Sequence, residues 1–228
     1  HDVTFSGLNI TGSAYVGIAP DAAMNLTIEG TNTISAATNY AGIYVPTNAT
    51  LIINGTGSLN VSGGNSAGIG GGAYNPIDPT GYTSGDPNCG TVEINGGTVT
   101  ATGGSMCAGI GGGSGADYSP GNGGTVTISG GAVTATGSSV GNLGGAGIGG
   151  SAGETDGSRA GSGGSLTISG GHVTLTAGHS TSYGFGQGTG KAPGGTCELT
   201  LTDASYLDSS TTLDPNGKYT INGDPTED

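Results

Sequence analysis

The sequence predicts an all-β chain wound into a single right-handed parallel β-helix of about seven rungs, with three short strands in each rung. Three observations predict this fold: short phrases recur in a fixed order, insertions are confined to the segments between them, and 53 of 228 residues are glycine. Glycine lacks the strict spacing of collagen. With no Trp and only two Phe, the core has to be a thin one, built from aliphatic side chains.

The first recurring phrase alternates apolar residues with others, which is the two-residue period of a half-buried strand. Stacked on successive turns, its outer two residues form interior ladders, with Leu26 expected over Leu51 and Ile28 over Ile53. Its copies are Leu26–Ile28, Leu51–Ile53, Val92–Ile94, Val126–Ile128, Leu166–Ile168 and Leu199–Leu201.

The second phrase is an alternating strand that ends in Ser or Thr, and the third places one bulky apolar residue after a glycine. A strand with one apolar face buries nothing alone, but stacked copies bury a continuous core. The second phrase occurs at Leu59–Ser62, Thr98–Thr102, Ala132–Thr136 and His172–Thr176. The third occurs at Val16–Ile18, Ala41–Ile43, Ala67–Ile69, Ala108–Ile110, Ala146–Ile148 and Tyr183–Phe185.

Glycine also marks the short corner between the first and second phrases. There we expect positive φ at Gly30, Gly55, Gly96, Gly130 and Gly170, and stacked amides at the asparagines before them. A propeller needs antiparallel blades, and a sandwich does not repeat its phrases so literally, so both alternatives are disfavoured.

We expect the chain to contain one domain. Residues 1–206 are expected to form the β-helix, with a degenerate first turn before residue 21, and residues 207–228 a C-terminal cap and linker. No run approaches the roughly 20 apolar residues of a membrane span, and no signal peptide opens the sequence. We therefore expect a soluble piece of a longer protein.

The charge balance excludes two classes of partner. Three Lys and Arg against sixteen Asp and Glu give a net charge of −13, which repels nucleic acid phosphate and anionic lipid. The cysteines form no metal-binding pair of the CxxC type. A disulfide between Cys89 and Cys107 would bracket one repeat, and buried, unpaired thiols are the favoured alternative.

The inserts after the third phrase carry the candidate binding residues. They run from Ala73 to Cys89, Ser114 to Gly123, Ser151 to Gly163 and Gln187 to Gly194, and stacking brings them side by side along one edge. Tyrosine rings suit the apolar face of a sugar, and carboxylates accept from its hydroxyls. We expect a glycan to contact Tyr74, Asp78, Tyr82, Asp86, Asp117, Tyr118, Glu154, Asp156 and Arg159. The alternative is a merely solvated surface whose loop lengths have drifted.

Calcium and catalysis are weaker alternatives at the same inserts. Gly112 to Tyr118 fits the GGxGxD phrase of calcium-binding β-rolls once, and stacked Asp78, Asp86, Asp117 and Asp156 would supply hard oxygens. The expected cofactor is therefore calcium or none. Arg159 beside Glu154 and Asp156, or Lys191 one rung away, is the one place for a lyase-like base and acids. We expect no enzymatic activity.

Threonine rows raise a third class of function. Thr100, Thr134 and Thr174 are expected to stack outward beside Thr102, Thr136 and Thr176, and flat threonine arrays on β-solenoids can bind ice. Asn60 and Ser62 interrupt the rows one rung earlier. Threonine is also simply a favourable outward strand residue.

The succession of phrases "ATLIINGTGSLNVSGG", "AGIGGG", "GTVEINGGTVTATGG" and "GGTVTISGGAVTATG" resembles the Gly-rich β-helical repeats of large surface proteins of Gram-positive, especially clostridial and gut, bacteria. It is also similar to a family of carbohydrate-binding domains with a pectate-lyase-like fold. The likeness covers roughly residues 3 to 202. It implies a secreted or cell-surface adhesin that binds a glycan, polysaccharide or host glycoprotein, with calcium as a candidate ligand. A structural stalk without a ligand is the main alternative.

Overall fold

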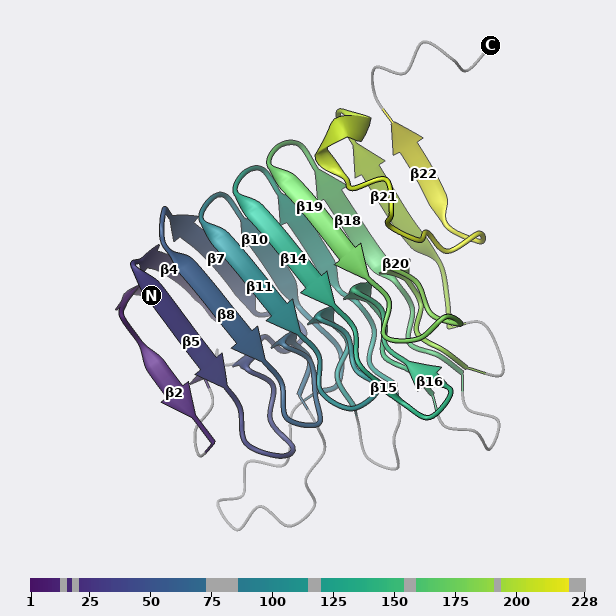
Figure 1. Ribbon diagram of the computed structural model, residues 1–228, viewed down its shortest axis with the longest axis horizontal. Helices are drawn as coiled ribbons and strands as arrows, with labels where there is room; N and C mark the ends of the chain where they lie inside the picture. Colours follow the sequence, from purple (N-terminus) through teal and green to yellow (C-terminus); the bar gives the residue numbers. More distant parts are fainter. Residues whose placement is uncertain are drawn as a thin grey trace.

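The chain forms a parallel β-helix, in which three parallel sheets run side by side along one column (Figure 1). The computed structural model describes residues 1–12, 16–17, 21–72, 86–114, 120–153, 159–190 and 194–221, without the side chains of residues 16 and 17. The predicted all-β, parallel β-helical fold is confirmed.

Each of the first six coils contributes one strand to each sheet. We call the eight-stranded sheet A and the two six-stranded sheets B and C. Sheet A contains β1 (Asp2–Ser6), β4 (Ala23–Glu29), β7 (Thr50–Gly55), β10 (Thr91–Ile94), β13 (Thr125–Ile128), β18 (Gly164–Ile168), β21 (Cys197–Leu201) and β22 (Lys218–Ile221). Sheet B contains β2 (Asn9–Thr11), β5 (Thr31–Ser35), β8 (Ser58–Ser62), β11 (Thr98–Thr102), β14 (Ala132–Thr136) and β19 (His172–Thr176). Sheet C contains β3 (Val16–Gly17), β6 (Ile43–Tyr44), β9 (Ile69–Gly70), β12 (Ile110–Gly111), β17 (Ile148–Gly149) and β20 (Phe185–Gly186).

Two small elements lie outside these sheets. β15 (Ser139–Val140) and β16 (Leu143–Gly144) form an antiparallel hairpin between β14 and β17. The 3-10 helix η2 (Ala204–Tyr206) follows β21 and is capped by the Asp203 side chain, which accepts from the Ser205 backbone N–H.

The last coil is built differently from the six before it. After β21, Leu207 forms a bridge to Val173 and Leu213 forms a bridge to Phe185, so residues 197–213 complete a seventh coil. β22 then lies over β21 and begins an eighth. Ladder positions thus continue through residues 207–221, within the segment 207–228 for which the sequence analysis expected a cap and linker.

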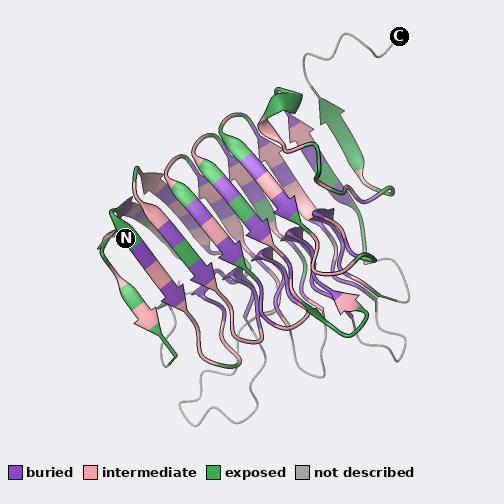
Figure 2. Ribbon diagram, viewed as in Figure 1, coloured by how far each residue is buried: buried purple, intermediate pink, exposed green. Residues whose placement is uncertain are grey.

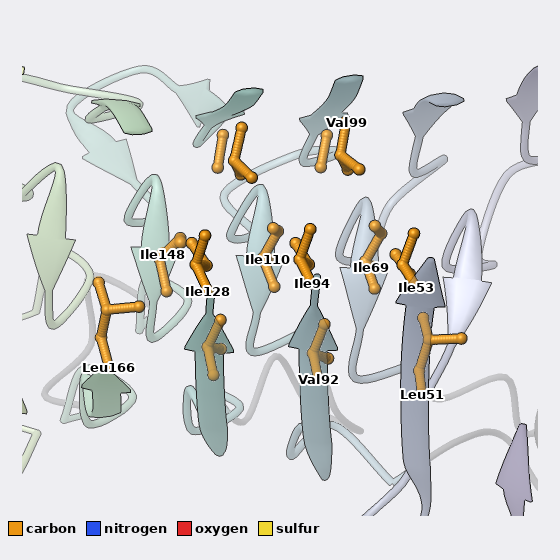
Figure 3. Close-up of a cluster of buried hydrophobic side chains, with 14 of the residues drawn as sticks. Leu51, Ile53, Ile69, Val92, Ile94, Val99, Ile110, Ile128, Ile148 and Leu166 are labelled. Atoms are coloured by element: carbon orange, nitrogen blue, oxygen red, sulfur yellow. The ribbon is translucent and has the colours of Figure 1, made fainter. Parts of the chain in front are cut away.

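The core is a set of aliphatic ladders that run the length of the column (Figure 3). Their side chains are buried in all three sheets, and along the strands of sheets A and B buried positions alternate with exposed or partly exposed ones (Figure 2). One ladder is Leu51, Val92, Val126, Leu166 and Leu199; a second is Ile53, Ile94, Ile128, Ile168 and Leu201; a third is Ile43, Ile69, Ile110, Ile148 and Phe185. Every member is at most 3 % exposed, so the predicted thin aliphatic core is confirmed from β6 and β7 onward.

The predicted register is wrong by two residues in the first coils. Met24 rather than Leu26 lies over Leu51, and Leu26 lies over Ile53. In sheet C, Val16 rather than Ile18 pairs with Ile43. A shift of two residues keeps the same side chains inward, so the alternating pattern alone does not distinguish the two registers.

The corner between sheets A and B is tight and nearly the same in each coil. Asn95 donates its amide to the Asn54 side chain at 3.0 Å, and Ser129 donates to the Asn95 side chain at 2.7 Å, as the expected amide ladder requires. The predicted positive φ is confirmed at Gly30 and Gly55, but in the next three coils it falls one residue later than predicted, at Gly97, Gly131 and Gly171. A Cβ at Gly131 would lie 2.4 Å from the Gly97 carbonyl oxygen of the preceding coil. Both this close contact and the positive φ disfavour any residue other than glycine at this position.

All three cysteines are buried and unpaired. The alternative of idle thiols is therefore confirmed over a disulfide between Cys89 and Cys107. Burial, with a smaller contribution from the Asp86 charge, raises the pKa of Cys89 to about 12, and burial raises the pKa of Cys107 to about 12. Thiols held in this state are poor nucleophiles.

Candidate functional site

The four inserts leave and rejoin the column at one corner, between sheets C and A. Each follows a sheet C strand and precedes the next sheet A strand, as the chain order of β9, β12, β17 and β20 requires. We call this corner the insert edge. It is defined by the residues that flank the inserts: Gly72 and Asp86, Ser114 and Pro120, Gly153 and Arg159, Gly190 and Gly194.

Backbone hydrogen bonds join these flanking segments from coil to coil. Gly72 donates to the Asp86 carbonyl at 2.9 Å and closes the first insert. The second insert is tied to the first by Gly113, which donates to the Pro87 carbonyl at 2.8 Å. In turn, Ser151 donates to Gly121 at 3.1 Å and Gly153 to Thr189 at 2.8 Å. The inserts, far apart in sequence, are thus anchored next to one another in space.

A ladder of polar side chains fastens the same corner. The Asn88 side-chain oxygen accepts from the Asn122 backbone N–H at 3.0 Å and from its side-chain amide at 2.8 Å. The Asn122 side-chain oxygen accepts from the Ser162 backbone N–H and hydroxyl, both at 2.9 Å. We call Asp86, Asn88, Asn122 and Ser162 the stem ladder. It satisfies backbone groups that the strand ladders leave unpaired where the chain re-enters the column.

Asp86 begins the stem ladder, and its carboxylate is already occupied. One oxygen accepts from the Asn88 backbone N–H at 3.0 Å and its amide at 2.8 Å, and the other accepts from the Thr47 backbone N–H at 3.2 Å. Burial by itself raises the pKa of Asp86, but the hydrogen bonds from Thr47 and Asn88 together outweigh burial and lower it. This carboxylate holds backbone in place, which competes with the metal or sugar contact expected from the sequence.

Buried polar side chains reinforce the anchors from inside. The Ser66 hydroxyl donates to the Gly71 carbonyl at 2.6 Å. The Ser151 hydroxyl accepts from the Gly121 N–H and donates to the Gly113 carbonyl, each at 2.8 Å. Gln187 accepts from the Gly194 N–H through its side-chain oxygen at 2.6 Å. These three residues are at most 8 % exposed, so the insert edge is fastened by groups shielded from water.

Of the predicted site residues, the structure describes two. Asp86 is half-buried in the stem ladder, and Arg159 is exposed where the third insert rejoins the column. The remaining predicted ligands lie outside the described residues: Tyr74, Asp78, Tyr82, Asp117, Tyr118, Glu154 and Asp156, as does Lys191.

The sequence analysis missed the stem ladder. A signal for it exists, because Asn88, Asn122 and Ser162 each lie three residues before the equivalent residues Thr91, Thr125 and Ser165 of sheet A. Among the described ranges, no three or more His, Cys, Asp or Glu side chains are grouped so that they could hold a metal ion. Nor does the described part of the chain contain a helix with the length and apolar character needed to cross a membrane.

Comparison with known proteins agrees with the fold. A family model described as a β-helix repeat matches residues 92–114 and 126–154, which span the central coils. No curated protein matches the chain. No solved structure matches it either.

Proposed function

We propose that this chain is an extracellular glycan-binding module of a bacterial surface or secreted protein, which contacts its ligand through the inserts and performs no catalysis. The observation that carries the proposal is the anchoring of all four inserts at one edge. A ligand that lies along the column axis would meet several inserts at once.

The chemistry of the inserts suits this ligand class. They contain Tyr74, Tyr82 and Tyr118 together with several carboxylates, which are the apolar faces and hydrogen-bond acceptors that sugars need. The stem ladder fixes the ends of the inserts, so less conformational entropy is lost when a ligand binds. A net charge of −13 favours a neutral or cationic glycan over an anionic one, unless calcium bridges the two.

A glycan array, run with calcium and with a chelator, tests the proposal. We expect at least one glycan to bind, and the triple variant Tyr82→Ala, Asp117→Ala, Tyr118→Ala to weaken binding by about tenfold or more. Glu29→Ala removes an exposed acidic residue at the tight corner, away from the inserts, so it is the control and should bind normally. The melting temperature of both proteins should stay close to that of the wild type.

Other outcomes identify the alternatives. Full binding by the triple variant would place recognition elsewhere on the column. Binding of no glycan in either buffer would favour a structural stalk. Release of unsaturated sugars from an acidic polysaccharide, abolished by chelator and by Arg159→Ala, would identify a lyase and refute the absence of catalysis.

A further inference from the structure

The outer face of sheet B carries two rows of uncharged polar side chains that extend further than the sequence indicated. The rows predicted over three coils continue in register through all six strands of the sheet, with a hydroxyl at ten of the twelve positions and an amide at Asn9 and Asn60. One row is Thr11, Ser35, Ser62, Thr102, Thr136 and Thr176; the row beside it is Asn9, Thr33, Asn60, Thr100, Thr134 and Thr174. We call these two rows the hydroxyl face.

The hydroxyl face is a regular two-dimensional array. Adjacent strands lie about 4.8 Å apart, and outward neighbours along a strand lie about 6.7 Å apart. The strands of sheet B lie side by side without crossing over one another along the column (Figure 1). Threonine is stiff at χ1, and Ser62 donates to the Ser35 hydroxyl at 3.1 Å, so many of the polar groups hold fixed positions before any ligand arrives.

The chemistry of this face differs from that of the rest of the chain. No outward position of β2, β5, β8, β11, β14 or β19 carries Asp, Glu, Lys, Arg, Phe or Tyr, and the one ring side chain among them is His172 at the first position of β19. The outward positions of sheet A, by contrast, include Asp2, Glu93, Glu198 and Lys218. In a chain with sixteen acidic residues, an uncharged face of six strands is a distinct surface.

These properties favour an ordered lattice of water over other ligands. Sugar-binding faces need aromatic rings, and phosphate-bearing polymers need cations. Each threonine hydroxyl donates one hydrogen bond and accepts others, while its methyl group excludes disordered water between the rows. Because the hydroxyls repeat at two fixed spacings, they would hold bound water in a regular, crystal-like arrangement at little entropic cost.

We propose that the hydroxyl face binds ice, independently of the insert edge. The test is microscopy of ice crystals in solutions of the whole chain, with inhibition of ice recrystallisation measured alongside. The wild type should shape crystals and slow recrystallisation. Thr134→Lys introduces a charge at an exposed position between Thr100 and Thr174, the middle of the unbroken threonine stretch, and should abolish most of this activity. Thr125→Lys, the same change at an exposed position of sheet A, should leave it intact.

Circular dichroism checks that both variants keep the wild-type fold, and the double variant Thr100→Val, Thr134→Val removes hydroxyls without adding charge. Unshaped crystals with the folded wild type at millimolar protein would overturn the proposal. Equal loss in Thr134→Lys and Thr125→Lys would also overturn it. Sedimentation with microcrystalline cellulose or chitin that Thr134→Lys abolishes, without ice shaping, would assign the face to a crystalline polysaccharide instead. Glycan binding at the inserts should be the same in all of these variants.

Discussion

At two corners of the column, the chain passes from one sheet to the next in different ways. Between sheets A and B, each coil turns in a few residues, with stacked amides and glycines that admit no Cβ. Between sheets C and A, the chain leaves for inserts of different lengths and returns to the same register. At the first corner, the backbone of the preceding coil leaves little room for side chains. The second is held by the stem ladder, which fixes where the chain re-enters whatever the insert contains.

This difference indicates that the fold tolerates insertions where the backbone N–H and C=O groups on either side of the insertion already have hydrogen-bond partners. At the tight corner, from Gly55 onward, a neighbouring carbonyl occupies the space of an added Cβ. At the insert edge, Gly71 and Gly121 are just as crowded, both by the Pro87 carbonyl, but side chains and backbone groups of adjacent coils also pair with each other there, so residues further out are free to vary. Substitutions should therefore have large effects at the first corner and in the stem ladder, and small effects within the inserts.

The largest effect is expected at the tight corner. Gly131→Ala should reduce the free energy of unfolding by roughly 3 kcal/mol or more, because a residue with positive φ would also meet the Gly97 carbonyl. Urea denaturation followed by circular dichroism measures the change. Gly141→Ala is the matched control, since Gly141 also has positive φ but a Cβ there would meet nothing within 4 Å. It should cost about 1 kcal/mol, and equal costs at both sites would show that crowding at the corner is unimportant.

A moderate effect is expected in the stem ladder. Asn122→Ala removes a side chain that bonds to both neighbouring coils, and it should cost about 1 to 2 kcal/mol. Hydrogen exchange measured on the same variant should show faster exchange at Cys89 and Ser162 than at Val99 in sheet B. Uniform acceleration across the column would contradict a local role for the ladder.

A smaller effect, dependent on pH, is expected at Asp86. Its pKa is lower in the folded chain than the ordinary value of 3.8, so its contribution to stability is present above pH 4 and is lost as pH falls through the lowered value. Asp86→Asn should therefore destabilise the chain more at pH 7 than at pH 2.5 in urea denaturation. A cost for Asp86→Asn that grows towards low pH would reverse the assigned sign.

The smallest effect is expected within an insert. Replacing residues 115–119 by two glycines should change the free energy of unfolding by less than about 0.5 kcal/mol, because closure entropy varies slowly with loop length. Thermal melting of the variant measures it. A loss as large as that of Asn122→Ala would show that this insert contributes to folding.

The sequence was sufficient to predict the fold wherever the phrases are literal copies. From β7 onward, equivalent residues such as Val92 and Val126 stack as expected, because identical spacing leaves one good alignment. β4 was misaligned because Met24, Leu26 and Ile28 offer three apolar positions, and two alignments bury the same face.

The first coils also contain a polar residue at an interior position. Asn32 lies opposite Leu59 and is fully buried, which hid β5 from a search for apolar alternation. Its side chain accepts from the Leu8 N–H and donates to the Glu29 and Ser58 carbonyls, so burial leaves none of its hydrogen-bonding atoms unpaired. The hydrogen bonds to Leu8 and Ser58 join residues of different coils that are more than twenty positions apart in the sequence. No local sequence pattern predicts such contacts.

The candidate site was predictable in position but not in detail. Chain order alone located the inserts at one corner, whereas the occupied carboxylate of Asp86 depends on the Thr47 backbone from another coil. Composition indicates which residue types an insert offers. It does not indicate which of these side chains already form hydrogen bonds with the backbone.

The most direct test of the account is a distance along the corner between sheets C and A. Thr47 is exposed at this corner one coil before the first insert, and Arg159 is exposed where the third insert rejoins the column. Nitroxide labels on Thr47→Cys and Arg159→Cys should lie three strand spacings apart, about 14 Å, plus the length of the label side chains. The native thiols are buried and should not react. Pulsed electron spin resonance that gives one narrow distance near this value would support the stacked inserts. A distance as long as the column, or a broad spread, would contradict them.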